Sequence, residues 1–186
     1  MINPKLIVAS FLMLFSVMSV SAQDVYFTKT GKIQFFSKTD VENIDATNNE
    51  VTSFFNKSTG ELVFAVLIKG FHFEKALMEE HFNENYMESQ KFPKADFKGK
   101  VTNLASVNFA KDGTYPVNVT GNLTIHGQTK PVTATGTITI AGGKISAQSK
   151  FDVALADYKI EKPAVVANKI SDRIQITVLT NYEAKK

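Results

Sequence analysis

Three histidines, His72, His81 and His126, are the side chains of this sequence best suited to proton transfer near neutral pH. A hydrolase would join one of them to a serine and an aspartate, and Ser89, His81 and Asp96 could form such a set in space. These residue types are common in a chain of 186 residues, so the set is weak evidence. Metal binding by the three histidines has no support from their spacing, because they fall on separate predicted elements.

Sequence motifs for other chemistry are absent. The chain has no cysteine, which excludes a thiol nucleophile and disulfides. It contains no G-x-S-x-G elbow, no H-E-x-x-H pair and no P-loop. The net charge of +3 and the dispersed lysines give no electrostatic footprint for nucleic acid. We therefore expect a protein that is not an enzyme, uses no cofactor or metal and does not bind nucleic acid.

The N-terminal residues resemble an export signal. Lys5 precedes an apolar run over residues 6–17, and small residues follow up to Ala22. The apolar run is too short for a stable membrane anchor and no stop-transfer cluster follows it. We predict that residues 1–22 are a signal peptide, and that residues 23–186 form one domain in the periplasm or outside the cell.

Most of the remaining chain alternates apolar and polar residues with a period of two, which indicates β-strands. Short turns rich in Gly, Asn and Asp separate the segments, as in antiparallel hairpins. About eight such strands favour an all-β, up-and-down antiparallel barrel, because closure removes exposed sheet edges. The predicted strands cover residues 32–39, 50–58, 61–73, 96–104, 114–125, 130–140, 144–155 and 173–183.

One segment departs from this pattern and predicts a helix. Residues 74–89 lack Gly and Pro and are rich in helix-forming residues. Met78, Phe82 and Tyr86 are four residues apart and therefore lie on one helical stripe. We expect this inserted helix to close one end of the barrel or to cover its flank.

The interior face of the barrel carries unusually small residues. In the strand 130–140, Thr residues point outward and the opposite face includes Ala134 and Gly136, with Ala147 on the next strand. An eight-stranded barrel has room for a ligand only where inward side chains are small. The alternative is that these residues let the helix pack closely on the sheet, leaving a solid interior.

Three stretches resemble the YceI family: "HFNENYMESQKFPKADFKG" (81–99), "VTGNLTIHGQTKPVTATG" (119–136) and "DYKIEKP" (157–163). The resemblance extends over nearly all of residues 23–184. It implies an exported, lipocalin-like barrel that binds a long polyisoprenoid, or a related fatty amphiphile, in its interior. The opening segment, residues 31–51, is shorter than is usual in the family, which favours the alternative of a solid-core structural or interaction domain without a ligand.

We predict that strands and helix together form an apolar ligand-binding wall. The alternation in residues 61–73 leaves open whether the set containing Phe64 or the set containing Val63 faces inward. The predicted wall consists of Phe64, Val66, Ile68, Phe71, Met78, His81, Phe82, Tyr86, Ala134, Gly136 and Ala147.

Polar groups are needed only where a lipid head would sit. His81 is the first candidate, because it lies beside the apolar stripe of the helix, and Asn85 and Lys130 are weaker ones. His72 and His126, at a strand end and in a turn, are expected to be exposed to solvent.

Overall fold

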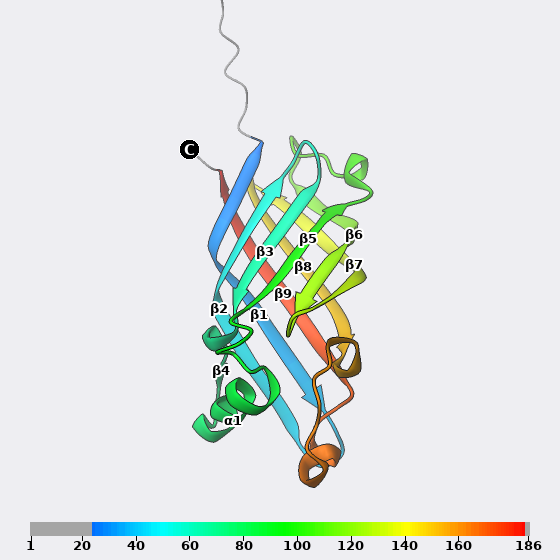
Figure 1. Ribbon diagram of the computed structural model, residues 1–186. Coiled ribbons are helices and arrows are strands. Elements are labelled where there is room, and N and C mark those ends of the chain that lie inside the picture. The colour runs from blue at the N-terminus through cyan, green and yellow to red at the C-terminus, as the bar shows by residue number, and fades with distance from the viewer. Residues whose placement is uncertain (1–23, 185–186) are drawn as a thin grey trace, which may run out of the picture.

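A computed structural model describes residues 24–184, so the predicted signal peptide lies outside the described residues. The described chain is a mainly antiparallel β structure with one α-helix (Figure 1). Its strands are β1 (Val25–Lys38), β2 (Asn43–Asn56), β3 (Glu61–Leu67), β4 (His72–Phe73), β5 (Lys94–Val101), β6 (Gly113–Ile125), β7 (Gln128–Ala141), β8 (Lys144–Ala154) and β9 (Arg173–Ala184).

Eight of these strands close into a barrel. The sheet order is β1-β9-β8-β7-β6-β5-β3-β2, and β1 also pairs with β2, so the sheet has no free edge along these strands. All of the pairings are antiparallel, and β4 adds a two-residue strand beside β2. The predicted up-and-down barrel of about eight strands is confirmed.

The two opening strands are longer than the sequence pattern predicted, at 14 residues each. In β1 the register shifts on both sides of Gly31, and such a bulge interrupts the period of two. In β2 the polar stretch before Val51 resembles a loop, yet Asn48 is fully buried there and donates a hydrogen bond from Nδ2 to the Leu67 carbonyl (2.9 Å). The opening segment thus spans the full height of the barrel.

The prediction of one continuous strand over residues 61–73 is wrong. β3 ends at Leu67, a 3₁₀ turn covers Ile68–Gly70, and β4 follows. Gly70 packs against the buried Asn48 amide, where any larger side chain would collide. The chain therefore changes direction within a segment whose sequence is apolar both before and after the turn.

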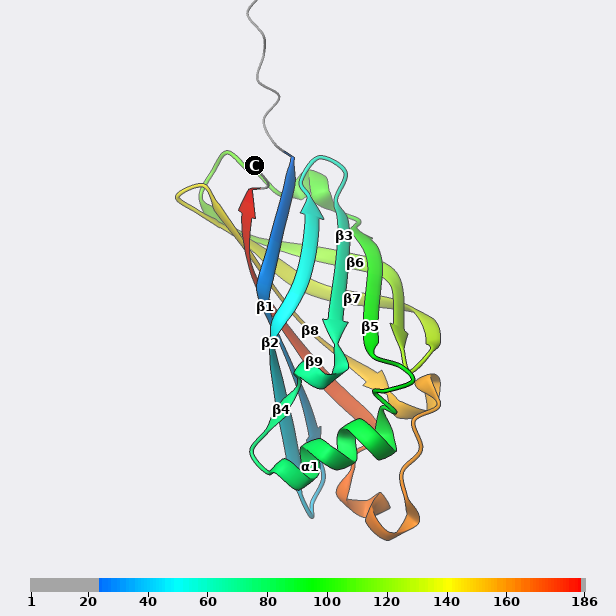
Figure 2. The ribbon, with the colours of Figure 1, turned by 60° about the vertical axis from the view of Figure 1, so that its left-hand side comes forward.

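The lower end of the barrel in Figures 1 and 2 carries most of the non-strand structure. The inserted helix is present near the predicted residues: α1 (Ala76–His81) continues into a wider helical turn, η2 (Phe82–Tyr86). It lies across this end of the barrel, opposite the 3₁₀ turns η4 (Leu155–Tyr158) and η5 (Ala164–Lys169). The β1–β2 turn also lies at this end (Figure 2).

The upper end is filled by side chains. Phe55, at 2% exposure, packs against the rings of Phe109 and Tyr182, with centroids 6.1 and 5.9 Å apart. Buried aliphatic residues from β6, β7 and β8 complete this cluster. No helix among residues 24–184 is long and apolar enough to cross a membrane.

Candidate functional site

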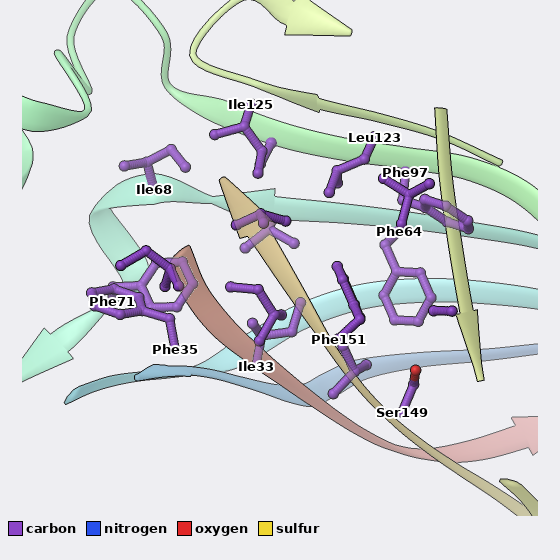
Figure 3. Close-up of a pocket in the computed structure, with 18 of the residues that line it drawn as sticks. Ile33, Phe35, Phe64, Ile68, Phe71, Phe97, Leu123, Ile125, Ser149 and Phe151 are labelled. Carbon is purple, nitrogen blue, oxygen red and sulfur yellow. The ribbon is translucent and has the colours of Figure 1, made fainter. Parts of the chain in front are cut away.

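The barrel encloses a cavity of about 530 Å³ whose walls are almost entirely apolar. Figure 3 shows side chains from opposite walls pointing toward one another, with Leu123 and Ile125 of β6 facing Ile33 of β1 and Phe151 of β8. The volume falls in the range of natural ligand sites. The interior of this barrel is therefore hollow.

The cavity is closed at the upper end and open at the lower end. At the upper end its walls are buried residues such as Phe55, Ile138 and Tyr182. At the lower end its lining includes exposed residues of α1 and η5, among them Leu77 and Lys169. We call this lower opening, between α1 and the segment around η5, the mouth.

All of the residues predicted to form the wall line this cavity. In β3 the inward set is the one that contains Phe64, which settles the alternative that the alternation left open. Phe82 packs in an aromatic cluster with Phe35, Phe71 and Phe73 at centroid distances of 5.3, 5.7 and 5.1 Å. The lining residues among those predicted are Phe64, Val66, Ile68, Phe71, Met78, His81, Phe82, Tyr86, Ala134, Gly136 and Ala147.

Gly136 has a role different from the one predicted for it. A Cβ at this position would lie 2.4 Å from the carbonyl oxygen of Gln148 in the neighbouring strand. The missing side chain thus permits close approach of β7 and β8, rather than leaving space for a ligand. Ala134, two residues away, lines the cavity and pairs with Val119 of β6.

Sequence reasoning missed several lining residues on strands that it had located. Val117, Val119 and Leu123 of β6 alternate strictly and could have been found from the period of two. Ile160 and Ile170 lie outside the strands, and no periodic signal marks them as part of the wall.

Polar side chains gather at the mouth. Lys75 lies 3.9 Å from Glu42, joining α1 to the β1–β2 hairpin, and both residues line the cavity. His81 is exposed at the rim, and its Nδ1 is 3.1 Å from the Asn85 amide nitrogen. Lys130, the other polar candidate, is exposed on β7 and does not line the cavity.

The closed end contains one buried polar pair. The hydroxyl groups of Ser53 and Tyr182 are 2.8 Å apart. Burial raises the pKa of the Tyr182 phenol above its usual value of 10.0, so this group stays neutral. The deep end of the cavity therefore offers no charge.

His126 is largely but not fully buried, which corrects the prediction that it is exposed: its side chain retains 11% exposure. Its Nδ1 lies 3.1 Å from the Tyr158 carbonyl oxygen and its Nε2 lies 2.8 Å from a Glu88 carboxylate oxygen. The Phe92 ring packs edge-on against the imidazole at 4.5 Å. The turn that carries His126 folds beneath two segments distant in sequence, which no local pattern reveals.

This contact joins three segments that flank the cavity wall. Glu88, His126 and Lys159 are the non-glycine residues with positive φ among residues 24–184, at 42°, 49° and 53°. The first two bond to each other, and the third follows Tyr158. Each left-handed residue costs free energy, so their meeting at one point shows that the surrounding contacts determine this conformation.

The catalytic alternatives receive no geometric support. Ser89 is buried and its backbone N–H donates to the Asn83 carbonyl, while the His81 ring contacts Asn85. Among residues 24–184 there is no cluster of three side chains suited to hold a metal ion.

The family model described as the YceI-like domain matches residues 13–182. The chain belongs to the YceI-like family. Residue 182 is the tyrosine at the closed end of the cavity, so the match spans the YceI-like barrel except for the last two residues of β9. A comparison with curated proteins finds no significant match.

Solved structures share this YceI-like fold at low sequence identity. A polyisoprenoid binding domain from Saccharophagus degradans, implicated in plant cell wall breakdown, is 15% identical, with 88% of this chain and 100% of that domain covered and a TM-score of 0.76. BcnA of Burkholderia cenocepacia is also 15% identical, with coverages of 82% and 96% and a TM-score of 0.67. The YceI protein of Campylobacter jejuni is 16% identical, with coverages of 100% and 99% and a TM-score of 0.54.

Proposed function

We propose that this protein is an exported lipid carrier that holds a polyisoprenoid, or another long-chain amphiphile, inside the barrel. The observation that carries the proposal is the apolar cavity of about 530 Å³. Each CH₂ group that moves from water into such a cavity gains about 0.8 kcal/mol, so binding requires area rather than specific chemistry. The structural neighbour from Saccharophagus degradans, described as a polyisoprenoid binding domain, supports this choice of ligand.

The geometry favours one orientation of the ligand. The deep end is lined by buried residues such as Phe55 and Ile138, and its phenol is neutral. The charged side chains Lys75, Glu42 and Lys169 are at the mouth. An apolar tail would therefore lie inside, with the polar head at the mouth, where its hydrogen bonds to water are kept.

The alternative of a solid-core structural domain is less well supported. It predicts that the inward side chains fill the barrel, and its main argument was a short opening segment. The opening strands β1 and β2 have 14 residues each, and the interior is hollow. An enzymatic role is not favoured either, since the walls of the cavity are almost entirely apolar.

Ligand identity can be tested on protein purified from its own host. Native mass spectrometry should show a bound mass that organic extraction releases, and fragmentation should identify an isoprenoid or fatty chain. Protein that is free of ligand, and that takes up no fluorescent polyisoprenoid or fatty-acid analogue, would contradict the proposal.

Export is tested separately by N-terminal sequencing of the protein from the periplasmic or culture fraction. Cleavage after Ala22 should give a chain that begins at Gln23, because the small residues before this point fit a signal peptidase. A retained apolar run would show that the signal-peptide assignment is wrong.

A further inference from the structure

The segment around η5 exposes an apolar run where loops are normally polar. Its sequence is "PAVVA", residues 163–167, flanked by Lys162 and Lys169. The first three residues of the run are exposed, and Val165 has 90% exposure, the highest among the exposed large apolar residues of the described chain. We call residues 163–167 the apolar tip.

The apolar tip is held in place by a largely buried lysine. Lys162 Nζ donates to the carbonyl oxygens of Ala167 (3.3 Å) and Ile170 (2.8 Å) and lies 2.6 Å from the Asp172 carboxylate. These bonds close the loop on its polar side. The side chain of Val165 consequently stays exposed to solvent, in an arrangement that the folded chain maintains.

Two further exposed apolar residues lie at the same end of the molecule. Leu77 of α1 is 62% exposed and Val41 of the β1–β2 turn is 58% exposed. Both views of the ribbon place α1, this turn and η5 at the lower end, where the cavity opens (Figures 1 and 2). The three most exposed large apolar side chains of residues 24–184 therefore belong to three separate elements around one mouth.

The apolar surface continues from the outside into the cavity. Val166 within η5 and Ile170 directly after it line the cavity, and so does Leu77 on the facing helix. A hydrocarbon chain could pass from the apolar tip to the interior beside these residues without leaving apolar contacts.

We propose that the mouth of the barrel docks on a lipid bilayer, with the apolar tip inserted at the membrane interface and Leu77 and Val41 as additional contacts. This docking rests on the proposed lipid binding, because a water-insoluble ligand must be collected from a membrane or delivered to one. The docking itself can be measured without any ligand.

A bilayer fits these side chains better than a protein partner does. Protein interfaces are built around a contiguous packed centre, rich in aromatic residues and Arg. Here the most exposed groups are single aliphatic side chains on three separate elements, Val41, Leu77 and Val165. A fluid bilayer accepts such groups one by one, since each gains free energy on leaving water independently of its neighbours.

The charges at this end indicate what kind of bilayer to expect. Lys162 and Lys169 flank the apolar tip, but α1 carries the acidic residues Glu79 and Glu80. Because positive and negative side chains are both present, the insertion of apolar side chains rather than electrostatic attraction has to supply the affinity for the bilayer. We therefore expect binding to vesicles of neutral phosphatidylcholine, with little dependence on salt.

The sequence contains no tryptophan, which provides a clean experiment. Protein from the exported fraction is prepared as Val165→Trp and, as the matched control, as Leu179→Trp on the outer side of β9, where an exposed apolar residue lies away from the mouth. Each is mixed with phosphatidylcholine vesicles that contain no polyisoprenoid, with and without brominated acyl chains.

The proposal predicts a blue shift and bromine quenching for Val165→Trp but not for Leu179→Trp. Val165→Asp should weaken vesicle binding about tenfold, the equivalent of losing the transfer of one valine side chain. No shift for Val165→Trp, or the same response from both tryptophan variants, would overturn the docking proposal.

Uptake of a fluorescent polyisoprenoid analogue presented in detergent separates this inference from the proposed function. Uptake without vesicle docking would leave the carrier intact and refute docking. Docking without uptake would support the membrane contact and refute the carrier.

Discussion

The two ends of the barrel are built from similar residues and differ in what those residues contact. At the closed end, Phe55 and Tyr182 pack in a cluster whose members are almost completely buried. At the mouth, Phe82 belongs to an equally aromatic cluster, yet it is only half-buried, and the residues beyond it are exposed. The first arrangement stabilises the fold, whereas the second leaves a hydrocarbon surface for something else to cover.

This difference explains how a barrel of ordinary size can remain hollow. The walls of a hollow barrel are not packed against side chains in its centre. Here the closed ring of hydrogen bonds between the strands holds these walls in place. The closed end adds a packed cluster at one side only. Stability and the proposed ligand binding thus depend on different parts of the same interior.

The largest effect should come from the closed end. Phe55→Ala removes a ring that is 2% exposed and should lower the free energy of unfolding by about 3 to 5 kcal/mol. Phe82→Ala at the mouth should cost only about 1 to 2 kcal/mol, because the half-buried ring loses less burial, but it should reduce uptake of a fluorescent lipid analogue. Urea denaturation of both variants checks this, and equal losses of stability would contradict the division between the two ends.

Two substitutions on β7, Gly136→Ala and Ala134→Phe, should affect the stability of the fold in the reverse order of the size of the group that each one adds. Gly136→Ala adds one methyl group, but this group would meet the Gln148 carbonyl of β8 at 2.4 Å. It should therefore destabilise the barrel by about 1 to 3 kcal/mol, as overpacking does. The denaturation midpoint is the measurement.

Ala134→Phe adds a whole ring on the same strand, directed into the cavity. The fold should tolerate it, and uptake of the lipid analogue should fall, since the ring occupies the space of the ligand. If Ala134→Phe instead unfolds the protein while the wild type takes up no lipid, the cavity does not serve as a binding site.

The fold and the cavity wall could be predicted from the sequence because both depend on local alternation. The inward set of β7, with Ala134 and Ile138, follows from the period of two. The wider YceI-like motifs then fixed the family. Turn signals placed the hairpins, and the spacing of apolar residues placed the helix.

The features that escaped prediction depend on contacts between distant segments. Gly136 looks like a space-giving residue, and only the position of β8 shows that it is needed for strand approach. His126 looks like an exposed turn residue, and only the placement of Glu88 and Tyr158 buries it. The break after Leu67 likewise depends on Asn48, 19 residues earlier, which bonds to that carbonyl.

The smallest expected effect concerns pH and the contact between Glu88 and His126. The hydrogen bond from His126, and then the nearby charge of Lys91, hold the pKa of the Glu88 carboxyl below its ordinary value of 4.5. A pKa that is lower in the folded than in the unfolded chain stabilises the fold above the unfolded value, and that stabilisation is lost as the pH falls through the folded value. Wild-type protein should therefore lose stability relative to Glu88→Gln as the pH falls below the ordinary value of 4.5, and the difference between them should be constant at higher pH. Urea midpoints at several pH values measure the difference, with Glu80→Gln on the exposed side of α1 as the control for removing one negative charge.

Because the Glu88 carboxylate is half-exposed, solvent screens its interactions and the effect should be small. Parallel curves for wild type and Glu88→Gln would show that the left-handed conformations around His126 are maintained by packing with Phe92 rather than by the contact between Glu88 and His126.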